Sequence, residues 1–214
     1  MSEMLKQLQQ AVIAGVPDQA RELAAQALES GVAPLVAIEE ALNPGMQIVG
    51  DKYETGEYFI PDLVMSAEAM KAAMAVFEPE LIARQEQRQV LGTVVIGTVA
   101  GDIHEIGKSL VATMLAAAGF QVHDLGVDVP ADKFVKQVQE TGANVVGLSA
   151  LLTTTMRNQE VVIEALKEAG LREKVKVIIG GAPASTEWAE TIGADAYAEN
   201  ANEAVGVVRQ LLGV

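Results

Sequence analysis

The sequence predicts an α + α/β chain: an antiparallel helical bundle over residues 1–88, then a five-stranded parallel sheet with helices on both faces over residues 89–214. Two observations predict it. Up to about residue 76, apolar residues recur at intervals of three and four, as in amphipathic helices. Beyond residue 89, short β-branched runs alternate with helix-periodic runs, which indicates βα units. Residues 81–89 are polar and of mixed charge, so we expect the boundary there.

The helices of the first part are expected to begin and end at turn-forming residues. The first helix has its periodic apolar positions at Leu5, Leu8 and Val12. The signals for the others are Asp18 as an N-cap, Gly31 as a stop, Pro34 in a first turn, Asn43-Pro44 as a cap and first-turn proline, Pro61 at the start of a long helix, and Glu78-Pro79 at its end.

The second part reads as five βα units. Strands are predicted at residues 91–98, 121–125, 144–149, 175–179 and 194–198. Helices are predicted at residues 107–118, 131–140, 155–169, 185–191 and 202–212, with Gly119, Gly142, Gly170 and Gly193 at their C-caps. We expect a flavodoxin-like (Rossmann-like) sheet of strand order 2-1-3-4-5. Such sheets bind ligands at the carboxyl ends of the strands, near the switch point between the first and third.

Composition excludes several classes of function. The net charge of −14 argues against partners such as nucleic acid or an anionic membrane surface. Without cysteine there is neither a disulfide nor a thiolate metal site. Residues 1–10 lack the pattern of a secretory signal, and no apolar run is long enough to span a bilayer, so we expect a cytoplasmic protein. His123 is expected at an edge or surface position, and with no cysteine partner a zinc site there is not expected.

Three loops at the carboxyl ends of the predicted strands carry the candidate functional residues. They are Gly101-Asp102-Ile103-His104, Ser149 to Thr155, and Gly180-Gly181-Ala182-Pro183. A carboxylate two residues before an imidazole can hold one ring N–H, so that the other ring nitrogen faces a metal. Gly107 permits either a tight turn or the close approach of a large group, and the glycine pair leaves room beside the fourth strand. Singly, a turn or a helix N-cap explains each feature, but neither explains their coincidence on one edge.

These residues resemble a known family. Asp102-Ile103-His104-Glu105-Ile106-Gly107, then Ser149-Ala150-Leu151, then Gly180-Gly181 match the D-x-H-x-x-G, S-x-L and G-G signature of cobalamin-binding domains. The segment Gly50 to Pro61 resembles the helical cap domain of methionine synthase and of corrinoid proteins in methyltransferase systems. The resemblance covers nearly the whole chain, with the motifs in the family's order.

The resemblance implies a cobalamin whose own base has left cobalt, with His104 as the lower axial ligand. Asp102 would bond the other imidazole nitrogen and Thr155 would bond Asp102, so that these three form a proton relay. The nucleotide tail would pass between the strands that end at Ser149 and Gly180-Gly181, and Phe59 would cover the upper face of cobalt. The implied cofactor contacts are Gly101, Asp102, Ile103, His104, Glu105, Ile106, Gly107, Ser149, Leu151, Thr153, Gly180, Gly181, Ala182, Phe59 and, more weakly, Glu54.

The function implied is that of a corrinoid methyl carrier, a component of a cobalamin-dependent methyltransferase system and not a complete enzyme. As methylcobalamin, the cofactor would carry methyl from a substrate-specific methyltransferase to a second methyltransferase that loads tetrahydrofolate or coenzyme M, with a reductive activation protein as a further partner. A cobalamin sensor would need an attached signalling module, and an isomerase subunit generally lacks the helical cap. The methyl donor stays open among methanol, methylamines, methoxylated aromatics and betaines.

Overall fold

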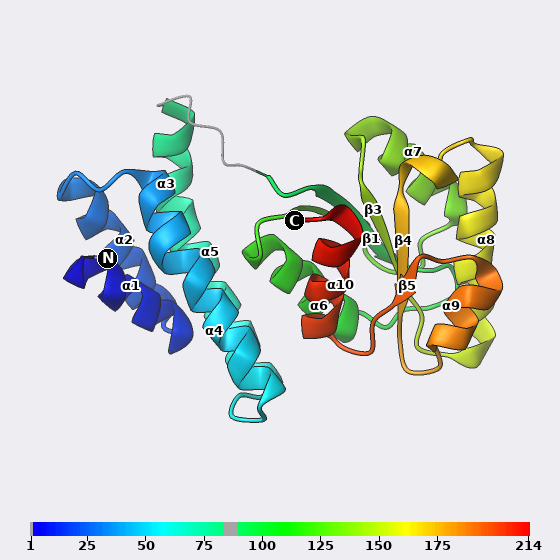
Figure 1. Cartoon of the computed structure of the whole chain (residues 1–214), viewed down its shortest axis with the longest axis horizontal. Coiled ribbons are helices and arrows are strands. Elements are labelled where there is room, and N and C mark those ends of the chain that lie inside the picture. Colours follow the sequence, from blue (N-terminus) through cyan, green and yellow to red (C-terminus); the bar gives the residue numbers. More distant parts are fainter. Residues whose placement is uncertain (1, 84–89) are drawn as a thin grey trace. The chain divides into compact units, whose positions relative to one another are not determined.

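The computed structural model describes residues 2–83 and 90–214 of the chain. It divides into two compact units, Met1–Gln89 and Val90–Val214, which we call the N-terminal and C-terminal units (Figure 1). Most of the predicted boundary segment, residues 84–89, lies outside the described residues. Within the described ranges, no helix combines the length and the apolar character needed to cross a bilayer.

The N-terminal unit is helical throughout. Its elements are α1 (Glu3–Ile13), α2 (Pro17–Glu29), α3 (Pro34–Ala37), the π-helical turn η1 (Ile38–Leu42), α4 (Asn43–Glu54) and α5 (Ile60–Ala83). Helix α5 packs along α2, and α1 packs against both α2 and α4. The apolar stripes meet in a core that includes Leu8, Val12, Leu42 and Phe77, which are all fully buried. The predicted helical bundle is confirmed.

Three predicted helix ends in this unit are wrong. Helix α2 starts at Pro17, so Asp18 lies inside its first turn and pairs with Arg21 at 3.0 Å instead of capping. Asn43 does not cap α4 either, because Leu42 before it is already helical, although Pro44 does lie in the first turn of α4 as predicted. The π turn before it, in which the Asn43 N–H donates to the Ile38 carbonyl five residues back, accommodates the missing proline N–H, and the helix runs on.

Pro79 is the third difference, because α5 continues through it to Ala83. A proline inside a helix removes one backbone hydrogen bond and crowds the preceding turn. The residues on either side of Pro79 are anchored, since Phe77 is fully buried and Leu81 nearly so. Tertiary packing of the apolar face therefore outweighs the local cost, which the sequence pattern alone did not show.

The C-terminal unit is a five-stranded parallel sheet of order β2-β1-β3-β4-β5, as predicted. Its strands are β1 (Thr93–Thr98), β2 (Gln121–Asp124), β3 (Val145–Ser149), β4 (Lys176–Gly180) and β5 (Ala196–Tyr197). Its helices are α6 (Ile106–Ala117), α7 (Ala131–Thr141), α8 (Thr153–Glu168), α9 (Thr186–Ile192) and α10 (Ala201–Leu212), with a short 3-10 turn, η2 (Arg172–Lys174), before β4. Gly142 and Gly193 end α7 and α9 with left-handed φ angles of 63° and 74°.

Successive side chains of the central strands point to opposite faces, so each strand contributes to two cores. Val95, Val146 and Val177 face one core, which α7, α8 and α9 cover. Val94, Val145 and Ile178 face the other, which α6 and α10 cover. Figure 1 shows these two layers of helices on either side of the sheet. Because both faces are buried, the loops at the strand ends are the exposed part of the sheet.

Candidate functional site

Three loops gather at the carboxyl ends of adjacent strands. Residues 99–105 follow β1, residues 150–152 follow β3, and residues 181–185 follow β4. Parallel pairing of Thr98 with Ser149, and of Ser149 with Gly180, ends all three strands at the same level. The structure therefore brings the predicted loops together at the switch point, where open α/β sheets bind their ligands.

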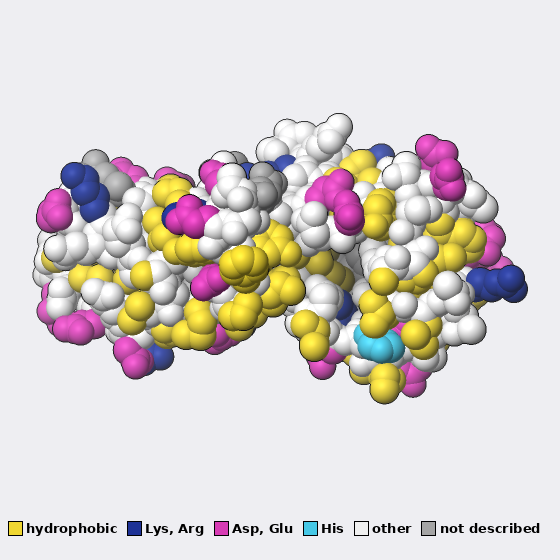
Figure 2. Space-filling view, turned by 90° about the horizontal axis from the view of Figure 1, so that it is seen from below, with side chains coloured by type: hydrophobic (Ala, Val, Ile, Leu, Met, Phe, Trp, Pro, Cys, Tyr) yellow, Lys and Arg dark blue, Asp and Glu magenta, His cyan; other side chains and the backbone are white. Residues whose placement is uncertain are grey.

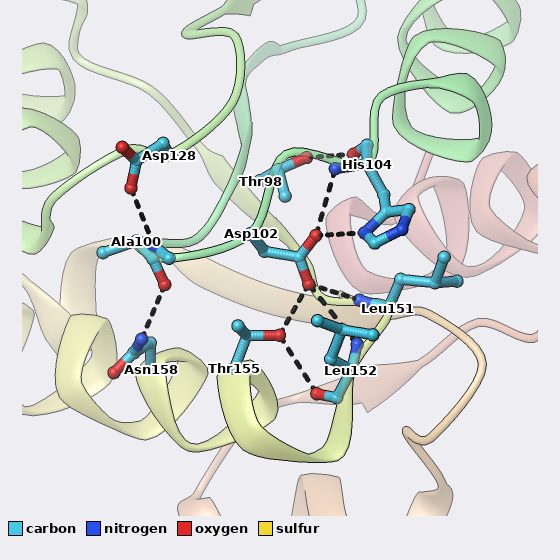
Figure 3. A network of polar contacts seen from close by, with 10 residues as sticks. Thr98, Ala100, Asp102, His104, Asp128, Leu151, Leu152, Thr155 and Asn158 are labelled. Carbon is cyan, nitrogen blue, oxygen red and sulfur yellow. Dashed lines mark hydrogen bonds and ion pairs between the residues drawn. The ribbon is translucent and has the colours of Figure 1, made fainter.

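Asp102 is the buried centre of this edge, with a side chain that is 0% exposed. Its Oδ2 accepts hydrogen bonds from the Thr155 hydroxyl at 2.6 Å and from the Leu151 N–H at 2.8 Å. Its Oδ1 accepts from the His104 N–H at 3.0 Å and lies 2.7 Å from His104 Nδ1 (Figure 3). Burial raises the pKa of Asp102, but the hydrogen bonds from Thr155, His104 and Leu151 together outweigh it and hold that pKa well below its usual range. Asp102 is therefore an anion at every physiological pH.

The ionised carboxylate sets the tautomer of His104. Because a carboxylate without a proton only accepts hydrogen bonds, the proton of the neutral imidazole sits on Nδ1. Nε2 then carries the lone pair, which is the form that ligates a metal. The His104 side chain is 46% exposed, and the Thr98 hydroxyl holds the His104 carbonyl at 2.9 Å. The loop thus presents the imidazole at the surface, with Nδ1 turned to Asp102 and Nε2 available.

Large apolar side chains surround this imidazole. Ile103 and Ile106 are 74% and 80% exposed, and Leu151 and Leu152 are also exposed. Figure 2 shows a histidine among hydrophobic side chains on this face of the C-terminal unit. A β-carbon added at Gly107 would meet nothing within 4 Å, and Gly107 is not among the glycines of positive φ. Of the two reasons considered for Gly107, open space for a large group is therefore the one that fits, and an apolar, exposed rim of this kind marks a binding surface.

The other predicted contacts of this unit lie around the same edge. Ser149 ends β3 half-buried, Thr153 begins α8 and is exposed, and Ala182 is exposed in the loop after β4. Glu105 is the exposed residue before α6. Gly101 has a φ of 79°, which explains why a glycine stands at the start of the loop.

The glycine pair does not leave the gap that the sequence predicted. The Ala150 N–H donates to the Gly180 carbonyl at 3.2 Å, so β3 and β4 stay paired to their ends. At Gly181 the φ is 121°, and an added β-carbon would lie 1.7 Å from the Ala150 carbonyl oxygen. Gly181 is therefore required by the close approach of the chain's own backbone. The backbones of β3 and β4 are therefore in direct contact at Ala150 and Gly181, and the path of the nucleotide tail beside them stays a prediction.

Two predicted contacts belong to the N-terminal unit. Phe59 immediately precedes α5 and is 66% exposed, an unusual position for a large apolar residue. Asp62 accepts a hydrogen bond from the Phe59 N–H at 2.8 Å, which fixes the backbone there. The side chain of Glu54 lies outside the described residues. The arrangement around His104 is complete within the C-terminal unit without either residue.

Sequence reasoning missed the second layer of the site. Asp128, from the β2–α7 loop, accepts from the Gly101 N–H at 2.7 Å, and Asn158, from α8, donates to the Ala100 carbonyl at 2.6 Å. The buried Lys108 of α6 pairs with Asp124 at the end of β2. Of these residues, only Asp128 could have been noticed in the sequence, as a turn-forming residue two positions after Gly126. The contacts themselves depend on the register of the sheet, which the sequence pattern does not show.

Within residues 2–83 and 90–214, no group of three or more His, Asp or Glu side chains gathers in the arrangement of a metal site. A metal that arrives inside a cofactor is already ligated on most sides and needs only one further ligand. The single available nitrogen of His104 suits that situation.

Known proteins resemble this chain over nearly its whole length. Residues 92–206 match a family model described as a B12 binding domain, and residues 4–78 match a second model with the same description. The chain is 50% identical over 213 residues to dimethylamine corrinoid protein 1 of Methanosarcina mazei, covering 98% of this chain and 96% of that protein. It is 47% identical to the trimethylamine corrinoid protein of Methanosarcina barkeri, covering 99% and 98%. The crystal structure of the methanol:cobalamin methyltransferase complex MtaBC from Methanosarcina barkeri is similar with a TM-score of 0.91 at 31% identity, over 99% of this chain and 80% of that one.

Proposed function

Because the chain belongs to the family of B12-binding corrinoid proteins of methyltransferase systems, we propose that it is a methyl carrier that works on a bound cobalamin. The observation that carries this proposal is the pair formed by buried, ionised Asp102 and exposed His104 at the switch point. This pair offers one ring nitrogen, Nε2 of His104, among exposed apolar side chains.

The residues present fit a corrinoid. His104 Nε2 would hold the cobalt, and the exposed side chains of Ile103, Ile106 and Leu151 would contact the corrin ring. Gly107, three residues after His104, has open space where a side chain would begin. When bound, the cofactor supplies the cobalt that accepts and releases the methyl group, while the protein supplies ligation, orientation and exclusion of water.

Asp102 and Thr155 control the proton on His104. The Asp102 carboxylate holds the Nδ1 proton, which raises the basicity of Nε2 as a ligand. When Nε2 is not ligated it can take a proton, and the same carboxylate then stabilises the imidazolium. Thr155, which donates to Asp102 and also to the Leu152 carbonyl at 3.0 Å, keeps the carboxylate in place through both states. The hydrogen bonds among these three residues support the proton relay that the family resemblance implies.

The first partner of this carrier is a substrate-specific methyltransferase. The similarity over nearly the whole chain to dimethylamine and trimethylamine corrinoid proteins makes a methylamine the methyl donor to test first, with methanol as the comparison. A second methyltransferase that loads tetrahydrofolate or coenzyme M and a reductive activation protein complete the proposed cycle. We place this cycle in the cytoplasm, where the predicted partners would be found.

The helical unit would serve as a cap over the methyl group. Besides Phe59, the neighbouring Ile60, Val64 and Met65 are exposed, so the start of α5 presents an apolar surface. A partner that reaches cobalt would have to displace such a cap, which is a gating step by domain motion.

The test is the spectrum of the reconstituted holoprotein. Protein grown with ¹⁵N-labelled histidine is loaded anaerobically with cobalamin in the Co(II) state, and its electron spin resonance is recorded. We expect superhyperfine splitting from one ¹⁵N nucleus, and its loss in His104→Ala while the cofactor stays bound. Splitting from the cofactor's own benzimidazole nitrogen would contradict the proposal.

A further inference from the structure

Residues 99–105, which follow β1 and carry His104, are called the ligand loop. A single peptide group near its start is held by hydrogen bonds at both its carbonyl and its N–H (Figure 3). The carbonyl of Ala100 accepts a hydrogen bond from Asn158 Nδ2 at 2.6 Å, and the N–H of Gly101 donates to Asp128 Oδ1 at 2.7 Å. Asn158 reaches this peptide from α8, and Asp128 reaches it from the β2–α7 loop. A peptide group whose donor and acceptor are both bonded to separate elements has a fixed plane.

The same peptide is the central one of a turn in which the Asp102 N–H donates to the Val99 carbonyl at 3.1 Å. Gly101 has a φ of 79°, and a β-carbon added there would meet nothing closer than 3.6 Å, so packing does not confine it. A glycine can take up many backbone conformations, and residues 103 to 107 that follow are all exposed. The Ala100–Gly101 peptide directly precedes Asp102, so its plane contributes to the position of the Asp102 backbone. The two hydrogen bonds to this peptide therefore act together with the Val99–Asp102 turn and the bonds of the Asp102 carboxylate in orienting His104.

The backbone of Asp128 shows that its position is specified. Its φ of 52° makes it the one non-glycine residue with a positive φ among those the structure describes. Such a conformation is unfavourable for a side chain and persists where surrounding contacts require it. Here the Asp128 N–H donates to the Asp102 carbonyl at 2.9 Å while its carboxylate holds the Gly101 N–H. Asp128 therefore contacts the ligand loop on both sides of Gly101.

We propose that Asp128 and Asn158 are positioning residues for axial ligation: together they lock the Ala100–Gly101 peptide and thereby orient Asp102 and His104 before the cofactor binds. This inference rests on the proposed function, since it takes His104 as the cobalt ligand. Neither residue touches the metal. Both act through the loop, in the way that outer-shell partners orient the ligands of metal sites.

The experiment uses the full chain loaded with Co(II) cobalamin and compares the ratio of His-ligated to unligated cobalt by spin resonance. Asp128→Gly removes the carboxylate but tolerates a positive φ, whereas Asp128→Asn keeps both an acceptor and that tolerance. Asn158→Asp places an acceptor against the Ala100 carbonyl. We expect Asp128→Gly and Asn158→Asp each to lower the ratio about tenfold, and Asp128→Asn to stay close to wild type. Asp132→Asn, an exposed carboxylate in the first turn of α7, is the control and should have no effect.

Each outcome decides one question. If the wild type shows no coupling to a protein nitrogen, the proposed function fails. If the wild type shows it and Asp128→Gly and Asn158→Asp match it, the lock fails and the function stands. Because both residues hold one peptide, the double variant should lose less than the product of the two single losses, and a full product would also overturn the lock.

A folding control separates positioning from collapse. Trp188, the only tryptophan in the chain, lies in α9 of the C-terminal unit, so its fluorescence reports the unfolding of that unit. The ratio is interpreted for variants whose apo-protein unfolds at the wild-type denaturant concentration. If Asp128→Gly does not fold, Asn158→Asp tests the same peptide from α8, and rescue by Asp128→Asn tests it from the other side.

Discussion

Replacing Asp102 by asparagine tests the reasoning about the site most directly. The side chain is buried and receives hydrogen bonds on both oxygens: from Thr155 and Leu151 on one, and from His104 on the other. An amide has only one accepting atom. Its NH₂ group must face either the Leu151 N–H or the His104 N–H, so one buried donor faces another donor in either orientation.

The magnitude follows from this count. A hydrogen bond to a charged group contributes about 1.5–3 kcal/mol, and the substitution removes the charge and about two such bonds. We therefore expect the C-terminal unit of Asp102→Asn to be about 3 kcal/mol less stable at neutral pH. If the amide nitrogen faces His104, the imidazole carries its proton on Nε2 and cannot ligate cobalt in that form, so His ligation should also fall by about 10–100-fold.

The effect has a definite pH dependence. The pKa of Asp102 is lower in the folded than in the unfolded protein, where an aspartate titrates near about 3.9. Its stabilising contribution is therefore complete above that value and is lost as the pH falls towards the folded pKa. The difference between wild type and Asp102→Asn should be largest at pH 7 and shrink below about pH 4.

The assay is chemical denaturation of the apo-protein followed by Trp188 fluorescence, with Asp132→Asn as the control for loss of an exposed carboxylate. Equal midpoints for wild type and Asp102→Asn at pH 7 would refute the account of the buried carboxylate. A difference that stays constant down to pH 3 would refute its ionised state in the folded protein.

Three further predictions follow from single contacts. Thr155→Val should destabilise the C-terminal unit by about 1–2 kcal/mol, because it removes the 2.6 Å hydrogen bond to the buried carboxylate of Asp102. Unfolding followed by Trp188 fluorescence measures this loss. If Thr155→Ser, which keeps the hydroxyl, were as unstable as Thr155→Val, the hydrogen bond would not be the cause. Gly181→Ala should lower the stability of the C-terminal unit by at least about 3 kcal/mol, since its β-carbon would lie 1.7 Å from a backbone oxygen, whereas Gly107→Ala should be tolerated. Similar unfolding midpoints for the two variants would contradict this prediction. Phe59→Ala, at a position that is 66% exposed, should change stability by no more than about 0.5 kcal/mol but speed photolysis of bound methylcobalamin, and unchanged light sensitivity would rule out its role as a cover.

Much of the fold could be predicted because the signals are local. A helix or a strand shows its period within a window of a dozen residues, and βα alternation then restricts the sheet to a few orders. The pairing of Asp102 with His104 was also predictable, since residues two apart on a tight loop are neighbours in any fold that exposes them. Local signals failed at two places. A π turn leads into α4 without a cap at Asn43, and burial of Phe77 and Leu81 outweighed the propensity of Pro79 to end α5.

The sequence by itself determined the helical unit, the parallel sheet with its switch point, and the imidazole with its carboxylate, because each depends on periodicity or on adjacent residues. Tertiary structure decided the rest: that β3 and β4 close against each other at Gly181, and that Asp128 and Asn158 hold the ligand loop. These contacts join residues 27 and 58 positions apart, and their geometry depends on strand register and on how α8 packs on the sheet. No local pattern encodes such distances, since they are set by packing across the whole unit.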